Sequence, residues 1–257
     1  MQNTSTNKEE RLLPINTSYI RCSRSDQKCM DYKALALITY FSKMNDDMYY
    51  MYNPELDRYI QDMEIEERYR VIFKEFIDEN IEKFEELSKT KRRTIRSQIN
   101  RLIKADNSVV NVEFDDDGRV YYSIMPYLTN SDELSMQGTY VTIESAILKY
   151  LIHVSNSDVI KVYCIFKWLL LGHVEKKVDR HWLCEQIGLS TKSDNNIKLV
   201  GDILTFLVED VELLRRRTVI EKSPTGAKTV YYYSLVPYKD WKRYRPMPEY
   251  FKRTRKY

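Results

Sequence analysis

Apolar residues recur at intervals of three and four positions over long stretches of the chain, which is the spacing of an amphipathic helix. The clearest stretch runs from Ile65 to Leu87 and leaves its acidic residues on the opposite face. The other segments with this spacing are Asp31 to Met44, Lys91 to Lys104, Ile143 to Val154, Asp158 to Leu171, Asp179 to Ile187 and Asn195 to Glu209. The pattern therefore predicts a mainly helical protein.

Shorter β-prone runs lie between these segments and come in pairs. The paired runs are Val109 to Phe114 with Arg119 to Met125, and Arg217 to Glu221 with Thr229 to Val236. Each pair flanks a turn with a glycine, Gly118 or Gly226, which tolerates the backbone angles that tight turns require. We expect one hairpin in each half of the chain, and a short strand from Ile15 to Cys22, which makes the fold α+β.

The chain contains an internal repeat at the end of each half. The segment Tyr121-Tyr122-Ser123-Ile124-Met125-Pro126-Tyr127 returns as Tyr232-Tyr233-Ser234-Leu235-Val236-Pro237-Tyr238, with five of seven residues identical. Each copy follows a helix, a β-prone run and a turn, which is the order of a winged helix-turn-helix module. In each Tyr pair we expect one side chain to pack into the core. The sequence thus predicts two tandem winged helix-turn-helix domains.

The size of the chain suits this division, because 257 residues with 43% hydrophobic content can build two modest cores. We expect an N-terminal arm (1–29), a first winged-helix domain (30–128), a linker (129–139), a second winged-helix domain (140–238) and a basic, aromatic tail (239–257). The boundary falls in the linker because that stretch is polar.

The charges are segregated along the chain, although the net charge is only +3. From Glu55 to Glu86 there are twelve acids and five bases, a balance of −7. From Lys89 to Lys104 there are seven bases and no acid, and residues 239–257 hold eight bases and two acids. Clustered bases on a helix that precedes a hairpin favour contact with nucleic acid, whereas a solvated basic face is the ordinary alternative.

The helix from Lys91 to Lys104 is the first candidate recognition helix, because its apolar residues Ile95, Ile99, Leu102 and Ile103 occupy one stripe. Arginine reads guanine in the major groove, and asparagine reads adenine. The side chains expected to face outward toward DNA are Lys91, Arg92, Arg93, Arg96, Ser97, Asn100, Arg101 and Lys104.

The second half offers a less basic helix and a more basic hairpin. From the helix and the turn before it, the candidate DNA-binding residues are Lys192, Asn195, Asn196 and Lys198. From the hairpin they are Arg215, Arg216, Arg217, Lys222 and Lys228, which could lie along the backbone or the minor groove. In contrast, Asp115, Asp116 and Asp117 at the first hairpin turn would be repelled by phosphates.

The segment from Trp182 to Lys192 resembles the L-x-x-x-I-G-L-S-x-x-T type of helix-turn-helix found in bacterial regulators and replication proteins. Together with the repeat and the basic helix, it makes the chain similar to the tandem winged-helix replication initiators of plasmids and other mobile elements, and to winged-helix regulators of phages. The resemblance implies binding to double-stranded DNA, with replication or transcription machinery as further partners. The oligomeric state stays open, because an exposed hairpin or the N-terminal helix could pair two copies into a homodimer.

Two alternatives remain beside replication initiation. A transcriptional regulator would use the same DNA contacts. A winged-helix protein-interaction scaffold would instead use the acidic helix between Glu55 and Glu86 to dock a basic partner.

Residues for catalysis or metal binding are sparse. There is no G-x-x-x-x-G-K-[ST] phosphate loop, and His181 and Cys184 lie one helical turn apart without two further ligands. We therefore expect no enzyme activity, no metal and no cofactor. The four cysteines show no C-x-x-C spacing, and Met1 to Glu10 has no apolar run, so we expect a cytoplasmic protein with no membrane partner.

Overall fold

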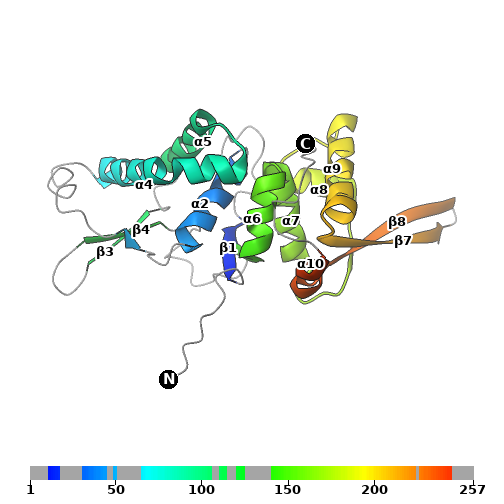
Figure 1. The fold of residues 1–257 in the computed structure, drawn as a ribbon. Helices are drawn as coiled ribbons and strands as arrows, with labels where there is room; N and C mark the ends of the chain where they lie inside the picture. The colour runs from blue at the N-terminus through cyan, green and yellow to red at the C-terminus, as the bar shows by residue number, and fades with distance from the viewer. Residues whose placement is uncertain are drawn as a thin grey trace, which may run out of the picture.

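The structure, a computed structural model, describes residues 11–17, 31–44, 49–50, 65–105, 110–114, 120–124, 140–223 and 226–244. Helices predominate among them, and the strands form small antiparallel sheets, so the expected mainly helical α+β class is confirmed (Figure 1). The expected aspartate turn, the linker at 129–139 and the tail beyond residue 244 lie outside the described residues.

The described residues of the N-terminal half form three helices and a three-stranded sheet. Its elements are α2 (Tyr32–Met44), β2 (Tyr49–Tyr50), α4 (Ile65–Ser88), α5 (Arg92–Ala105), β3 (Val110–Phe114) and β4 (Val120–Ile124). The two strands of the expected hairpin, β3 and β4, are paired, and β2 adds to the other edge of β4. The helices and the hairpin predicted for this half are therefore confirmed, whereas no strand was predicted at β2.

The C-terminal half repeats this order after one extra strand and helix. Its elements are β5 (Tyr140–Glu144), α6 (Ser145–Val154), α7 (Ser157–Leu169), β6 (Lys176–Lys177), α8 (Arg180–Gln186), α9 (Asp194–Thr205), the π-helical turn η3 (Phe206–Asp210), β7 (Leu214–Ser223), β8 (Gly226–Leu235) and α10 (Tyr238–Tyr244). The short strand β6 pairs with β8, as β2 pairs with β4. Both sheets therefore place the last strand in the centre.

The repeated tyrosine motif occupies equivalent positions in the two sheets. Tyr122 lies opposite Val112 of β3 and Tyr50 of β2, and Tyr233 lies opposite Arg216 of β7 and Lys176 of β6. Tyr233 is buried against the Phe166 ring, with 5.3 Å between ring centroids, so the expected inward packing is confirmed for the second copy. The tyrosine side chains of the first copy lie outside the described part of the chain.

Part of the expected N-terminal arm belongs to the core. Strand β1 (Leu12–Asn16) pairs antiparallel with β5, and its Leu13 and Ile15 are buried. In β5, Val141 and Ile143 are buried while Thr142 is exposed, which is the period-two alternation of a half-buried strand. The expected strand from Ile15 and the expected helix start at Ile143 are corrected accordingly, because the alternation merges directly into the apolar face of α6.

A single hydrophobic cluster extends across both halves, from Leu13 to Trp241. Helix α2 packs against α6 and α7, and α4 packs against α6. At this junction the Lys33 ammonium donates to the carbonyl of Ser88, the last residue of α4 (2.9 Å), and to the carbonyl of Ser155, which directly follows α6 (2.8 Å). Burial lowers the pKa of Lys33 to about 8. The two halves are therefore joined through packed helices.

Candidate nucleic-acid interface

Two helix pairs with tight connections present the expected recognition helices. Three residues join α4 to α5, and Lys89 among them has a φ of 54°, in the left-handed region. Between α8 and α9, Gly188 has a φ of 76°, and the Leu189 amide donates to the Cys184 carbonyl at 2.9 Å. The positive φ of Gly188 shows why a side chain at this position would be strained.

Helix α5 is divided into three stripes. Ile95 and Ile99 are fully buried and hold the helix on the core, as expected. On the exposed surface, Arg93, Ser97 and Asn100 follow one another at spacings of four and three residues, so they share a face. Lys91 is exposed just before the first turn. The side chains of Leu102, Ile103 and Lys104 lie outside the described part of the chain.

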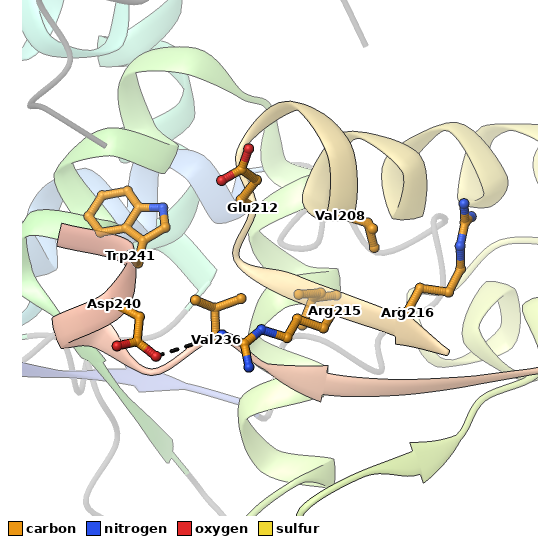
Figure 2. Close-up of a pocket in the computed structure, with 8 residues that line it drawn as sticks. Val208, Glu212, Arg215, Arg216, Val236, Asp240 and Trp241 are labelled. Atoms are coloured by element: carbon orange, nitrogen blue, oxygen red, sulfur yellow. Dashed lines mark ion pairs between the residues drawn. The ribbon is translucent and has the colours of Figure 1, made fainter. Parts of the chain in front are cut away.

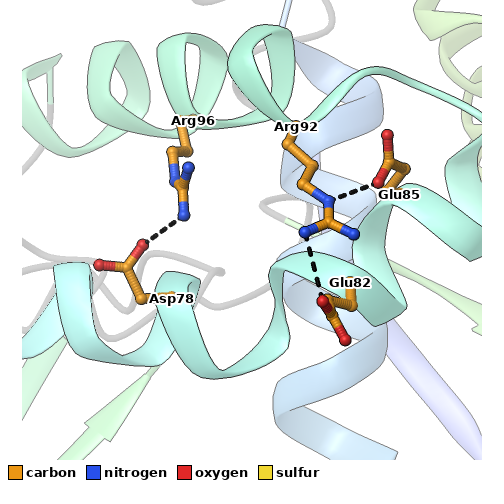
Figure 3. Close-up of polar contacts among 5 residues, drawn as sticks. All are labelled: Asp78, Glu82, Glu85, Arg92 and Arg96. Atoms are coloured by element: carbon orange, nitrogen blue, oxygen red, sulfur yellow. Dashed lines mark hydrogen bonds and ion pairs between the residues drawn. The ribbon is translucent and has the colours of Figure 1, made fainter.

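The third stripe of α5 is held by the acidic helix α4 (Figure 3). The Arg92 guanidinium lies 3.2 Å from the Glu82 carboxylate and 2.5 Å from that of Glu85, and Arg96 lies 2.9 Å from Asp78. The hydrogen bond to Glu85 raises the pKa of Arg92. Arg92 and Arg96 were expected to face outward toward DNA, but in the structure their charges are directed to α4.

Arg101 has a different surrounding from the other arginines of α5. Its guanidinium donates two hydrogen bonds, of 2.8 and 2.6 Å, to the carboxylate of Asp31, which is 0% exposed and directly precedes α2. This hydrogen bonding raises the pKa of Arg101. The expectation that Arg101 faces outward with Arg93 is therefore corrected, because a buried carboxylate requires a charged partner.

Helix α9 exposes fewer positive charges than α5. Val200, Ile203 and Leu204 are buried, and Asn195 and Lys198 are exposed, as expected. Asn196 is half-buried and donates from Nδ2 to the Ser190 carbonyl at 2.9 Å, so it stabilises the turn before the helix. Lys192 is exposed in that turn. Since Asp194 and Asp202 are exposed nearby, the outward face of α9 has almost no net charge.

Three consecutive arginines at the base of the β7–β8 hairpin form ion pairs. Arg215 lies 3.7 Å from Asp240, Arg216 lies 3.0 Å from Glu209, and Arg217 pairs with Glu175. Tyrosine rings support two of these cations: the Arg216 guanidinium lies 5.7 Å from the Tyr231 ring and that of Arg217 lies 4.8 Å from the Tyr232 ring. Lys222 and Lys228, farther out on the hairpin, are exposed.

A hollow of 620 Å³ lies where the hairpin meets the body (Figure 2). Its walls come from η3, the start of β7 and α10, and it is lined by Val208, Glu212, Leu214, Arg215, Arg216, Val236, Asp240 and Trp241. Trp241 is buried and donates from its indole nitrogen to the Val211 carbonyl at 3.0 Å, so α10 is fixed to the body. The hollow is therefore lined both by apolar side chains and by charged side chains that form ion pairs.

The acidic partners are the residues that the sequence pattern did not reveal. Glu85 and Glu209 each lie seven positions before the arginine they bind, on the far side of a turn, and Asp31 lies 70 positions from Arg101. Only the pairs seven positions apart could have been predicted from the sequence, because their two residues flank the same turn. Three arginines are paired at the hairpin base and three on α5. The candidate cations for which the described residues show no salt bridge are Lys91, Arg93, Lys192, Lys198, Lys222 and Lys228.

In the part of the chain that the structure describes, no three His, Cys, Asp or Glu side chains are grouped to hold a metal ion. None of the described helices is both long enough and apolar enough to cross a membrane. Comparison of the sequence with models of known protein families gives no match, and comparison with curated proteins gives none either.

Proposed function

We propose that this protein binds double-stranded DNA through two winged helix-turn-helix modules. In each half the described elements follow the order helix, strand, helix, helix, strand, strand, and the short strand pairs with the last one. This is the order of a winged helix, in which the third helix enters the major groove and the final hairpin is the wing. In this interpretation α5 and α9 are the recognition helices.

The outward stripe of α5 is the observation that carries the proposal. Arg93, Ser97 and Asn100 lie on a surface opposite to buried apolar residues, and Lys91 stands beside the first turn. An arginine and an asparagine on one stripe provide the two side chains best suited to the edges of guanine and adenine. The neighbouring Arg92 and Arg96 can exchange exposed carboxylates for phosphates, because ion pairs at the surface contribute little stability.

The shared core of the two halves supports a single composite site. Because α2 and α4 pack on α6 and α7, the two recognition helices are carried by one connected body. Such a body would read two DNA segments at a fixed separation. We therefore expect strong discrimination against insertions between the two half-sites.

We further propose that the binding serves replication initiation of a plasmid, phage or other mobile element, with transcriptional regulation as the alternative. The protein-interaction scaffold is less well supported, because Asp78, Glu82 and Glu85 of the acidic helix already hold arginines of α5. The resemblance of the helix-turn-helix segment is what favours initiation.

Selection of bound fragments from genomic DNA of the source tests both levels of the proposal. Enrichment of one sequence would support specific binding. Repeated copies of it beside an A·T-rich region would favour initiation, and a single copy overlapping a promoter would favour regulation. If no fragment is enriched over the input, the protein does not bind DNA specifically and the proposal fails.

A further inference from the structure

The β7–β8 hairpin extends beyond the rest of the C-terminal half (Figure 1). Its ten residue pairs run from Leu214 with Leu235 to Ser223 with Gly226. The base is held by the buried Leu214 and Tyr233. The four residues after Val219 add about 13 Å to its reach, at the usual rise of a strand. This outer end is long enough to touch a ligand that rests against α9.

The two sides of the hairpin differ in chemistry. Directly opposed residues point to the same side, and successive residues point to opposite sides. The first side, here called the helix-facing side, consists of Arg216, Thr218, Ile220 and Lys222 with Tyr233, Tyr231, Thr229 and Ala227. At its base Arg216 pairs with Glu209 of η3, and the Arg180 guanidinium of α8 lies 5.9 Å from the Tyr231 ring. This side therefore adjoins α8 and the turn η3 that directly follows α9.

The opposite side of the hairpin carries its one acidic residue, Glu221, which lies across from Lys228. Glu221 lies there, 2.9 Å from the Lys177 ammonium, and this hydrogen bond lowers the pKa of Glu221. Arg217 is paired with Glu175 on the same side. In contrast, the outer part of the helix-facing side has no acid and one cation, Lys222. The acidic residue of the hairpin itself is thus turned away from the side that adjoins α9.

Ile220 is the exposed apolar side chain in the middle of this outer, helix-facing part. It is 66% exposed, and its cross-strand neighbour is Thr229. A single exposed isoleucine is unremarkable on its own. Its place beside Lys222, on an acid-free strand surface, matches the chemistry of proteins that insert an apolar side chain between base steps of the minor groove.

We propose that Ile220 enters the minor groove next to the major groove occupied by α9, where it wedges between two base pairs and bends the duplex. This inference rests on the proposed function, since it concerns how the same DNA is held. Lys222 then lies near a phosphate that flanks the wedge, and the groove's negative potential attracts it. Pyrimidine–purine steps unstack most readily, so we expect one at the wedged position.

The bend of a selected duplex, labelled at both ends for fluorescence energy transfer, tests this inference. The wild-type protein should bend the duplex within the range of about 20–90° seen for apolar wedges. Ile220→Ala should lose most of the bend and Ile220→Leu should keep it. Val174→Ala is the matched control, because Val174 is an exposed aliphatic residue, 88% exposed, outside the hairpin. It should leave the bend unchanged.

A duplex with a mismatch at the wedged step provides a second readout. Less stacking is lost there, so the wild-type protein should bind the mismatched duplex more tightly than the matched one. Ile220→Ala should show no such preference. If the wild-type protein binds without bending, or Ile220→Ala bends as strongly, the wedge is refuted while the proposed function stands. If the wild-type protein binds no duplex, the proposed function itself fails and the wedge fails with it.

Discussion

The two halves of this protein have the same strand order but carry their positive charge on different elements. In the N-terminal half the charge lies on helix α5, which exposes Arg92, Arg93 and Arg96, and on Lys91 just before it. In the C-terminal half helix α9 is nearly neutral, and the bases lie on the β7–β8 hairpin. A shared topology therefore does not imply a shared mode of contact. We infer that the first half reads DNA mainly with its helix, and the second mainly with its hairpin.

The largest expected effect is on DNA affinity when the outward stripe of α5 is removed. The double variant Arg93→Ala/Asn100→Ala should cost roughly 2–6 kcal/mol on the preferred sequence, because each bidentate base contact contributes about 1–3 kcal/mol. The matched variant in α9, Asn195→Ala/Lys198→Ala, should cost about 1 kcal/mol. Fluorescence anisotropy with the selected duplex measures both. A larger loss for the α9 variant would reverse the comparison.

Arg101 should affect stability instead of DNA readout. Arg101→Met leaves the buried Asp31 carboxylate without its guanidinium, so we expect a loss of about 2 kcal/mol in the free energy of unfolding. The loss is at the low end for a buried ion pair because the Arg101 side chain is 38% exposed. Urea unfolding checks this value, with Arg93→Met on the same helix as a control that should unfold like the wild-type protein.

Helix α5 shows which structural features the sequence predicts and which it does not. The period of 3.6 residues in the sequence predicts the helix. It also predicts which side chains are buried, Ile95 and Ile99, and that Arg93 is exposed, because this pattern is local information. The pairing of Arg101 with Asp31 depends on how α2 packs against α5, and no local pattern encodes that. The division of α5 into an α4-facing stripe and an outward stripe was missed for the same reason.

The strands show the same limit. Both hairpins were predicted, because ten or more residues of β-prone sequence surround a turn. The two-residue strands β2 and β6 were not, because two residues cannot establish an alternation. Strand β1 was expected a few residues later, within an N-terminal arm. Its pairing with β5 spans more than a hundred residues, and only the tertiary fold brings these segments together.

Salt dependence should separate the hairpin from the helix. Lys222→Ala should lower the slope of log affinity against log salt by about 1, because one phosphate contact is lost, and it should weaken binding to all sequences alike. Arg93→Ala should instead alter the preferred sequence. Titrations on the selected and on an unrelated duplex distinguish these outcomes. A change of sequence preference in Lys222→Ala would show that the hairpin also reads bases through this residue.

The smallest expected effect concerns the acids of α4. The double variant Glu82→Gln/Glu85→Gln frees Arg92 from its two carboxylates, so the affinity for any duplex should rise and the salt slope should become steeper by up to about 1. Glu86→Gln, on the same helix, is the control and should have less effect, since the side chains that the structure describes show no ion pair between the Glu86 carboxylate and α5. Weaker DNA binding in the double variant would mean that α4 positions Arg92 for DNA rather than competing with it.

The most direct test of the central claim is the affinity of the wild-type protein for the selected duplex at several salt concentrations, measured beside Arg93→Ala. We predict a log–log slope of roughly −5, as expected for about six phosphate contacts, and a loss of sequence preference in the variant. Binding that does not change with salt, and that is the same in both proteins, would contradict the assignment of α5 as a DNA-reading helix.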